Sequence, residues 1–130
     1  MKVRTVLIDW DDAANDWRAY RQVELVGRNP RRPDVVLFLN GMPLVVVELK
    51  GAEGEDVEAA WNQIETYKRD VPQLFRTALV SVISDGIDAR YGTLSAGLDR
   101  FMLWRTADGE TETAATEALA LATLTWPAPF

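Results

Sequence analysis

The chain has 130 residues, of which 48% are hydrophobic and 26% charged, and its formal net charge is −6. This length and composition are typical of a single soluble globular domain. The sequence contains no cysteine and no histidine, which excludes disulfides, thiolate or zinc–histidine sites, and catalytic histidines. Any metal chemistry must therefore use carboxylate and carbonyl oxygens, which favours magnesium or manganese over zinc.

The distribution of apolar and charged residues limits where the protein can be located and what it can bind. No apolar stretch approaches the ~18 residues of a membrane span, and no secretory signal pattern is present, so we expect a cytoplasmic protein without membrane association. The overall negative charge argues against an autonomous, tight nucleic-acid binder. Residues 1–50 nevertheless carry a small positive net charge. Arg28, Arg31 and Arg32 in this half either meet a phosphate backbone or belong to a solvated turn.

The first predicted elements are strands and the turns between them. Val3–Asp9 is rich in β-branched residues, which predicts a strand. Residues 17–26 give mixed signals, and the alternation of apolar residues within Gln22–Val26 indicates a strand there. Residues 27–33 contain a glycine, an asparagine and two prolines, which is typical of a loop.

Two nearly continuous apolar runs, Asp34–Asn40 and Pro43–Lys50, predict core strands that are covered on both faces. Asn40 and Gly41 between the runs are a strong signal for a β-hairpin. Met42 is expected to make the connecting loop slightly longer than two residues. The two runs are therefore predicted to pair antiparallel.

A helix is predicted to begin near Asp56, which can serve as its N-cap, and to end before Pro72. Its apolar face follows the i, i+3, i+4 spacing of Val57, Ala60, Trp61, Ile64 and Tyr67. After it, Ala78–Ser84 predicts a buried strand, 90–94 a short strand or a turn, and Phe101–Arg105 an edge strand. This order predicts an α/β domain with a mixed sheet and a crossover helix over residues 1–109. Residues 110–130 are predicted to form a C-terminal helix or a loosely ordered tail.

Three polar side chains are expected at one end of the predicted hairpin. Asp34 opens the first strand and Glu48 closes the second, so antiparallel pairing brings both carboxylates to one edge. Glu48 and Lys50 are two residues apart on a strand, so their side chains point to the same face. Two acids that hold a divalent cation beside an ammonium group are what metal-assisted phosphodiester cleavage requires.

A simpler interpretation is an exposed Glu-x-Lys ion pair, which contributes about 0–1 kcal/mol. The apolar run before Glu48 argues against it, because an acid emerging from a buried strand beside another acid is costly without a cation or hydrogen bonds. On the helix, Gln63 and Tyr67 share a face, and an amide and a phenol can both hydrogen-bond a phosphate oxygen. Alternatively, Tyr67 belongs to the apolar stripe and Gln63 borders it.

These motifs occur together, in register and in order, between about residues 3 and 109. The chain thereby resembles the N-terminal nuclease domain of the restriction (R) subunit of type I restriction–modification enzymes, a member of the PD-(D/E)xK nuclease superfamily. The matching segments are Arg32-Pro33-Asp34 through Asn40-Gly41 to Glu48-Leu49-Lys50, Gln63 through Tyr67-Lys68, Ile83-Ser84-Asp85-Gly86, Ala89-Arg90-Tyr91-Gly92, and Phe101 through Arg105.

The resemblance implies a restriction-endonuclease-like fold, with a mixed β-sheet core and flanking helices, and a Mg²⁺-dependent DNA endonuclease that hydrolyses phosphodiester bonds. It implies that Asp34 and Glu48 bind Mg²⁺ with help from the Leu49 carbonyl, and that Mn²⁺ can substitute. Lys50 would orient or activate the attacking water and stabilise charge on the phosphate. Gln63 and Tyr67 would correspond to the family's Gln-x-x-x-Tyr motif, which supports cleavage near the metal.

The resemblance also implies partners: double-stranded DNA, an ATP-driven translocase, and the specificity and methylation subunits. The 130 residues contain no Walker-type phosphate loop, so ATP is expected to act only through a motor outside this chain. The chain is also expected to lack an upstream helix that often supplies another acid in the family. The alternatives are a non-catalytic fragment of the same fold that binds DNA or protein, and a repair- or recombination-type nuclease of the same superfamily.

Overall fold

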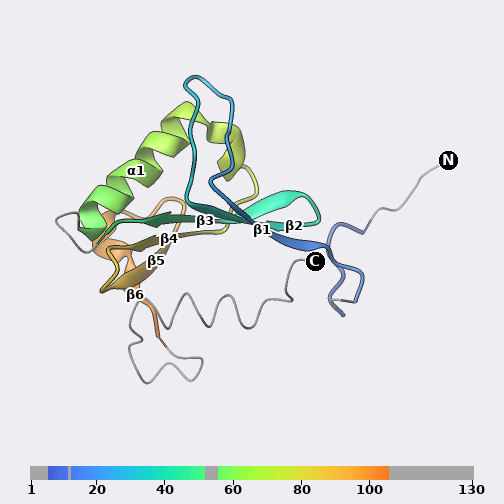
Figure 1. Ribbon diagram of the computed structural model, residues 1–130. Helices are drawn as coiled ribbons and strands as arrows, with labels where there is room; N and C mark the ends of the chain where they lie inside the picture. Colours follow the sequence, from blue (N-terminus) through green and yellow to red (C-terminus); the bar gives the residue numbers. More distant parts are fainter. Residues whose placement is uncertain (1–5, 12, 52–55, 106–130) are drawn as a thin grey trace.

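A six-stranded sheet with one α-helix packed on one face forms the centre of the computed structural model, which describes residues 6–11, 13–51 and 56–105 (Figure 1). The strands lie in the sheet in the same order as in the chain. Their bounds are Trp17–Arg21 (β1), Val35–Leu39 (β2), Met42–Leu49 (β3), Val80–Ser84 (β4), Ala89–Thr93 (β5) and Met102–Leu103 (β6). The predicted α/β class with a mixed sheet is confirmed.

Neighbouring strands are antiparallel throughout this sheet except for β3 and β4, which are parallel. Helix α1, Val57–Asp70, makes the crossover between these two strands, as the strand order predicted. A 3₁₀ turn, η1, follows it at Pro72–Phe75, and a second one, η2, spans Leu98–Arg100 before β6. The crossover helix packs over β3 and β4, in the middle of the sheet (Figure 1).

The β2–β3 hairpin forms as predicted and turns in two residues. Asn40 and Gly41 have positive φ angles of 51° and 81°, which is the backbone that a tight type I′ hairpin turn requires. Leu39 pairs directly with Met42. Met42 therefore belongs to the strand, and the loop is shorter than the sequence led us to expect.

The predicted strand Val3–Asp9 is wrong in its described part, because residues 6–9 have no β-structure; residues 3–5 lie outside the described residues. The Asn15 side chain hydrogen-bonds both backbone groups of Asp9. It accepts from the Asp9 N–H at 2.9 Å and donates to the Asp9 carbonyl at 2.7 Å. With these groups satisfied by a side chain, this segment makes no ladder hydrogen bonds there.

The strand expected at Gln22–Val26 forms earlier, as β1. Gln22 has a φ of 52°, a left-handed conformation that is uncommon outside glycine and that ends the strand. The following residues form a loop up to Pro33, in which Leu25 and Arg31 make an isolated antiparallel bridge. The predicted loop thus begins about five residues earlier than expected, and it rises beside the C-terminal end of α1 (Figure 1).

Helix α1 has the cap and the apolar face that its sequence predicted. The Asp56 side chain accepts a hydrogen bond from the Ala59 N–H at 3.0 Å, and the helix ends two residues before Pro72. The core lies between this helix and the sheet, and its fully buried members include Val36, Val46, Ala60, Ile64, Val71 and Ile83.

The C-terminal half of the sheet forms largely where it was expected, with β4, β5 and a short edge strand β6. The predicted domain boundary at residue 109 and the segment 110–130 lie outside the described residues. Within the described parts of the chain, no helix has the length and apolarity needed to cross a membrane.

Candidate active site

The hairpin register brings Asp34 next to the end of β3. Val35 pairs with Val47, so Asp34, one residue before β2, faces the segment that contains Glu48. The Asp34 carboxylate accepts a hydrogen bond from the Leu49 N–H at 2.8 Å. The predicted meeting of the two acids at one end of the hairpin is therefore present in the structure.

Glu48 is the buried centre of the site, with only 4% of its surface exposed. Lys50 Nζ lies 3.2 Å from one carboxylate oxygen, and the Tyr67 hydroxyl donates a 2.8 Å hydrogen bond to the other. Lys50 comes from the end of β3 and Tyr67 from the buried face of α1. Two strands and the crossover helix thus bring four of the predicted residues together: Asp34, Glu48, Lys50 and Tyr67.

Burial and its hydrogen-bonded neighbours act in opposite directions on the pKa of Glu48. Burial raises the pKa of Glu48, and the nearby negative charge of Asp34 raises it further, while the hydrogen bond from Tyr67 and the Lys50 ammonium lower it. The balance leaves this pKa above its ordinary value. A buried carboxylate in this position is stabilised by any additional positive charge nearby.

Tyr67 is a hydrogen-bond donor at neutral pH and not a base. Burial and the contact with Glu48 raise the pKa of its phenol well above the usual range. Gln63, one turn earlier on α1, contacts the same hydroxyl and acts in the opposite direction on its pKa. Gln63 and Tyr67 also line a cavity of about 460 Å³ that lies between α1 and the β1–β2 loop.

The donor atoms of the site fit a hard divalent cation. In the described parts of the chain, no three acidic side chains gather at one point, and the acids of this site are Asp34 and Glu48. Both are oxygen donors, and Mg²⁺ is commonly bound through one or two carboxylates while it keeps several waters. Burial, and to a smaller extent repulsion by Asp34, raises the pKa of Glu48, and a bound cation would offset both effects.

Gln22 is a member of the site that the sequence did not reveal. Its side-chain amide donates to Asp34 Oδ1, and its backbone N–H donates to the Asp34 carbonyl at 3.0 Å. The Gln22 side-chain amide and the Leu49 N–H thus occupy the two carboxylate oxygens of Asp34 and hold them in place. The contact depends on the left-handed backbone at Gln22, which no motif or periodicity in the sequence indicates.

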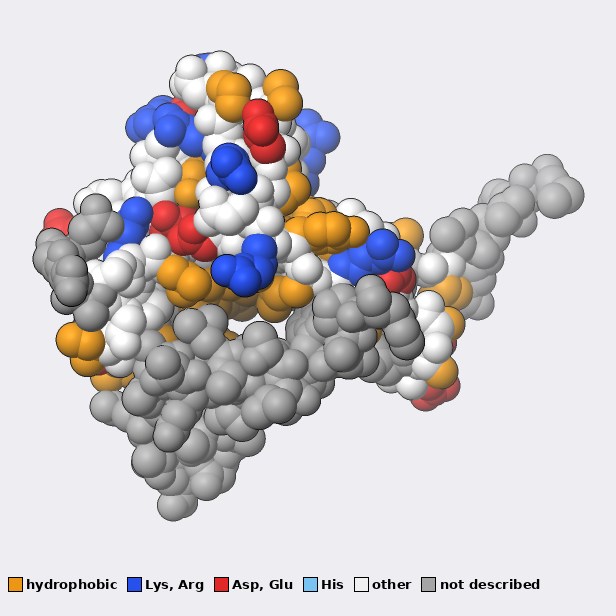
Figure 2. Space-filling model, viewed as in Figure 1, with side chains coloured by type: hydrophobic (Ala, Val, Ile, Leu, Met, Phe, Trp, Pro, Cys, Tyr) orange, Lys and Arg blue, Asp and Glu red, His pale blue; other side chains and the backbone are white. Residues whose placement is uncertain are grey.

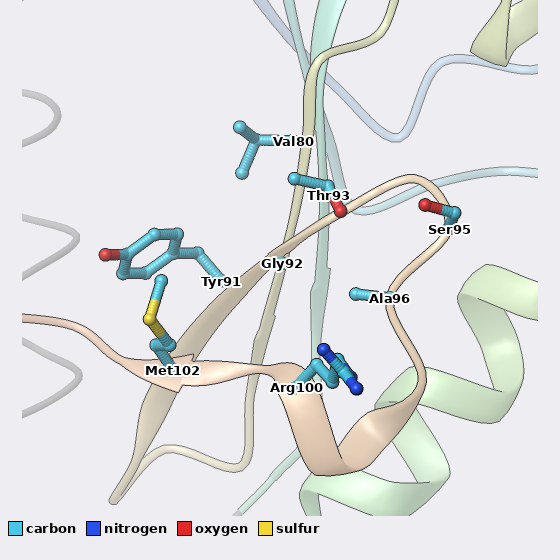
Figure 3. Close-up of a pocket in the computed structure, with 8 residues that line it drawn as sticks. All are labelled: Val80, Tyr91, Gly92, Thr93, Ser95, Ala96, Arg100 and Met102. Atoms are coloured by element: carbon cyan, nitrogen blue, oxygen red, sulfur yellow. The ribbon is translucent and has the colours of Figure 1, made fainter.

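A second cavity of about 500 Å³ lies over β4, β5 and the segment before β6, and none of the predicted site residues lines it (Figure 3). Tyr91 and Met102, which pair across β5 and β6, lie next to each other at one end of it. None of the described residues that line this cavity is acidic. It therefore lacks the donors for a metal-dependent hydrolysis.

Comparison with known proteins finds one family model and several relatives, all of which are named as type I restriction enzymes. Residues 2–100 match the family model described as the N terminus of the type I restriction enzyme R protein. The chain is 42% identical over 113 residues to the type I restriction enzyme HindI endonuclease subunit of Haemophilus influenzae, an alignment that covers 83% of this chain and 11% of that protein. It is 36% identical over 81 residues to the putative type I restriction enzyme MjaIXP endonuclease subunit of Methanocaldococcus jannaschii, covering 62% of this chain and 8% of that protein. The chain thus spans about a tenth of the length of these two relatives.

Proposed function

The chain belongs to the family of type I restriction enzyme R protein N termini, and on this basis we propose that it is a Mg²⁺-dependent DNA endonuclease domain that hydrolyses phosphodiester bonds. The observation that carries the proposal is the convergence of Lys50 and Tyr67 on the buried Glu48 carboxylate, with Asp34 beside it. Two acids and an ammonium group at the end of a hairpin are the groups that such a reaction uses. The curated relatives are named endonuclease subunits, which supports the same reaction class.

Asp34, Glu48 and the Leu49 carbonyl are the proposed ligands of Mg²⁺, for which Mn²⁺ can substitute. When bound, the cation supplies a Lewis acid that offsets the negative charge developing on the phosphate. Gln22 and the Leu49 N–H hold the Asp34 carboxylate, and Tyr67 holds that of Glu48. This chain's own contribution is therefore a pair of oriented acids whose rotamers are set before the substrate arrives.

Lys50 and Gln63 are the proposed contacts to the reacting groups. The Lys50 ammonium is only 19% exposed, so its charge is poorly screened and can stabilise the phosphate as a water oxygen attacks phosphorus and the P–O ester bond breaks. The Gln63 amide can donate to a non-bridging phosphate oxygen. The Tyr67 hydroxyl proton is already committed to Glu48, so Tyr67 acts by positioning that carboxylate.

The complete enzyme is proposed to be a multi-subunit restriction system that acts on double-stranded DNA. The chain aligns with about a tenth of relatives named as endonuclease subunits, so most of such a protein lies outside the aligned part. We propose that an ATP-driven translocase in that larger protein, together with specificity and methylation subunits, delivers DNA to this domain. ATP then acts through the motor and not at the site around Glu48.

Nicking of supercoiled plasmid tests the catalytic proposal. The parent chain, Lys50→Ala and the control Lys68→Ala are incubated with Mg²⁺ or Mn²⁺, and circular dichroism checks that each variant is folded. Lys68 pairs with Glu65 on α1 and matches Lys50 in charge, so its removal controls for the loss of a lysine. We expect nicking by the parent and Lys68→Ala, and none by Lys50→Ala.

An unchanged nicking rate in folded Lys50→Ala would contradict the proposed role of the ammonium group. Absence of nicking by all three proteins would contradict autonomous catalysis by these 130 residues. In that case the non-catalytic alternative, a module of the same fold that binds DNA or protein, would become the better description.

A further inference from the structure

We propose that the β1–β2 loop, residues 22–33, is the surface on which this domain holds the sugar–phosphate backbone of its DNA, with Arg28 and Arg32 contacting phosphates. The inference rests on the proposed function and deepens it, because it assigns the substrate-binding surface beside the site around Glu48. It also separates the arginines of this loop into two roles, a structural one for Arg31 and a substrate-binding one for Arg28 and Arg32.

The loop forms one wall of the cavity that opens beside the candidate site. Pro30, Arg31 and Arg32 line the loop side of this cavity of about 460 Å³, and Gln63 and Tyr67 line the opposite side on α1. The carbonyl oxygen of Arg32 lies 3.5 Å from the Tyr67 hydroxyl oxygen. Because Tyr67 contacts both Glu48 and the Arg32 carbonyl, the loop lies next to the place where a phosphate would meet Glu48 and Lys50.

The loop is pinned to the end of α1. Asp70, only 2% exposed, accepts hydrogen bonds from Arg31 Nε at 2.8 Å and from Arg31 Nη2. The Arg28 N–H donates to the Asp70 carbonyl at 2.8 Å. Gly27 lets the backbones approach this closely, because a Cβ there would lie 2.3 Å from the Asp70 carbonyl oxygen. The exposed arginines are thus carried on a wall that is formed before DNA binds.

The three arginines differ in their partners. The guanidinium of Arg31 is paired with Asp70 and holds the pKa of that carboxyl below its usual value. Arg32 is exposed, and its hydrogen bond to the Gln22 carbonyl is long, at 3.4 Å. The Arg28 side chain is also exposed. Arg31 therefore stabilises the loop, while Arg28 and Arg32 carry charges that face solvent.

The charge of the segment matches a phosphate backbone. Residues 21–34 contain four arginines and two acidic residues, whereas the whole chain has a net charge of −6. Figure 2 shows Lys and Arg side chains on both flanks of the end of the molecule where this loop projects beside α1. Glu24 also lines the cavity, and Asp34 and Glu48 repel phosphates. The exposed arginines supply the attraction that these acids oppose.

Salt-dependent DNA binding without cleavage tests this assignment. Binding of a labelled duplex is measured by fluorescence anisotropy in EDTA over a series of salt concentrations, for the full chain, the double variant Arg28→Ala/Arg32→Ala and the control Arg100→Ala. The Arg100 side chain is 79% exposed in η2, outside the loop, so it matches the loop arginines in exposure. We expect the double variant to bind unrelated duplexes more weakly by a common factor. Its slope of log K against log salt should be smaller in magnitude by about 2, while Arg100→Ala keeps the parent slope.

Equal affinity and slope in the parent and the double variant would overturn the assignment, and so would the absence of DNA binding by the parent at low salt. An equal loss in Arg100→Ala would also overturn it, because the effect would then follow net charge and not the loop. Failure of the catalytic proposal would give a different experimental result. A parent that binds DNA through the loop arginines but nicks no plasmid supports the binding surface and contradicts autonomous nuclease activity.

Discussion

Removal of a single oxygen, in Tyr67→Phe, should destabilise the domain. Tyr67 is only 3% exposed and its ring packs in the core, so the change deletes only the hydroxyl that donates to Glu48 at 2.8 Å. A hydrogen bond to a charged group contributes about 1.5–3 kcal/mol, and loss of the donor leaves a buried carboxylate oxygen without this partner. For a domain of this size that corresponds to a fall in Tm of roughly 5–15 °C.

The same substitution should weaken the site. Without the hydroxyl the pKa of Glu48 moves further upward, because a contact that lowers it is gone. Loss of a group that orients a metal ligand typically costs about 10–100-fold in metal affinity or activity. We therefore expect Tyr67→Phe to need more Mg²⁺ for nicking than the parent.

Thermal and urea unfolding in EDTA, followed by circular dichroism, measures the stability change in the absence of metal. Tyr91→Phe is the matched control, because Tyr91 is half-buried at the second cavity. Its ring meets that of Trp104 edge to face, with the ring centroids 5.6 Å apart. It should change the unfolding free energy by less than about 0.5 kcal/mol. If Tyr67→Phe were as stable as the parent or more stable, the reasoning that this hydroxyl holds the buried carboxylate would be wrong.

Three further outcomes are expected. Glu48→Gln keeps an acceptor for Tyr67 but removes a buried charge, so it should raise Tm in EDTA and abolish nicking; a lower Tm would contradict this. Arg31→Ala should lower Tm because it removes the shorter ion pair of the buried Asp70 and leaves only the longer one to Arg69, whereas Arg32→Ala should leave Tm unchanged; equal Tm values in a thermal scan would refute the division of roles. The pKa of Asp70 lies below its usual 3.8, so its contribution to stability is present above that pH and is lost as the pH falls through the lowered value. Urea midpoints of the parent should therefore fall more steeply in acid than those of Asp70→Asn, and parallel curves would count against the ion pair.

Much of the fold followed from local patterns. The Asn40-Gly41 turn needs positive φ angles that these residues adopt readily, and the apolar runs on either side could bury both faces only as strands. The cap at Asp56 and the i, i+3, i+4 spacing of α1 are likewise local. The early strand Val3–Asp9 was wrong in its described part because a side chain, Asn15, competed for the backbone, which β-propensity does not register.

The site shows the same division. Asp34, Glu48 and Lys50 could be brought together from the sequence, since antiparallel pairing across a short turn and the alternation of a strand indicate where their side chains lie. For Tyr67 the sequence left two interpretations, a member of the apolar stripe or a ligand of phosphate. In the structure its ring packs in the core and its hydroxyl donates a hydrogen bond to Glu48.

Most of the elements, and the groups that local geometry brings together, could therefore be predicted from local patterns in the chain. The contacts of Gln22 with Asp34, Tyr67 with Glu48 and Arg31 with Asp70 could not, because they form only when distant segments pack together. These pairs are 12, 19 and 39 residues apart in the chain. They depend on a left-handed turn at the end of β1 and on how α1 packs across the sheet, and both are set by the burial of the whole core and not by any neighbouring residues.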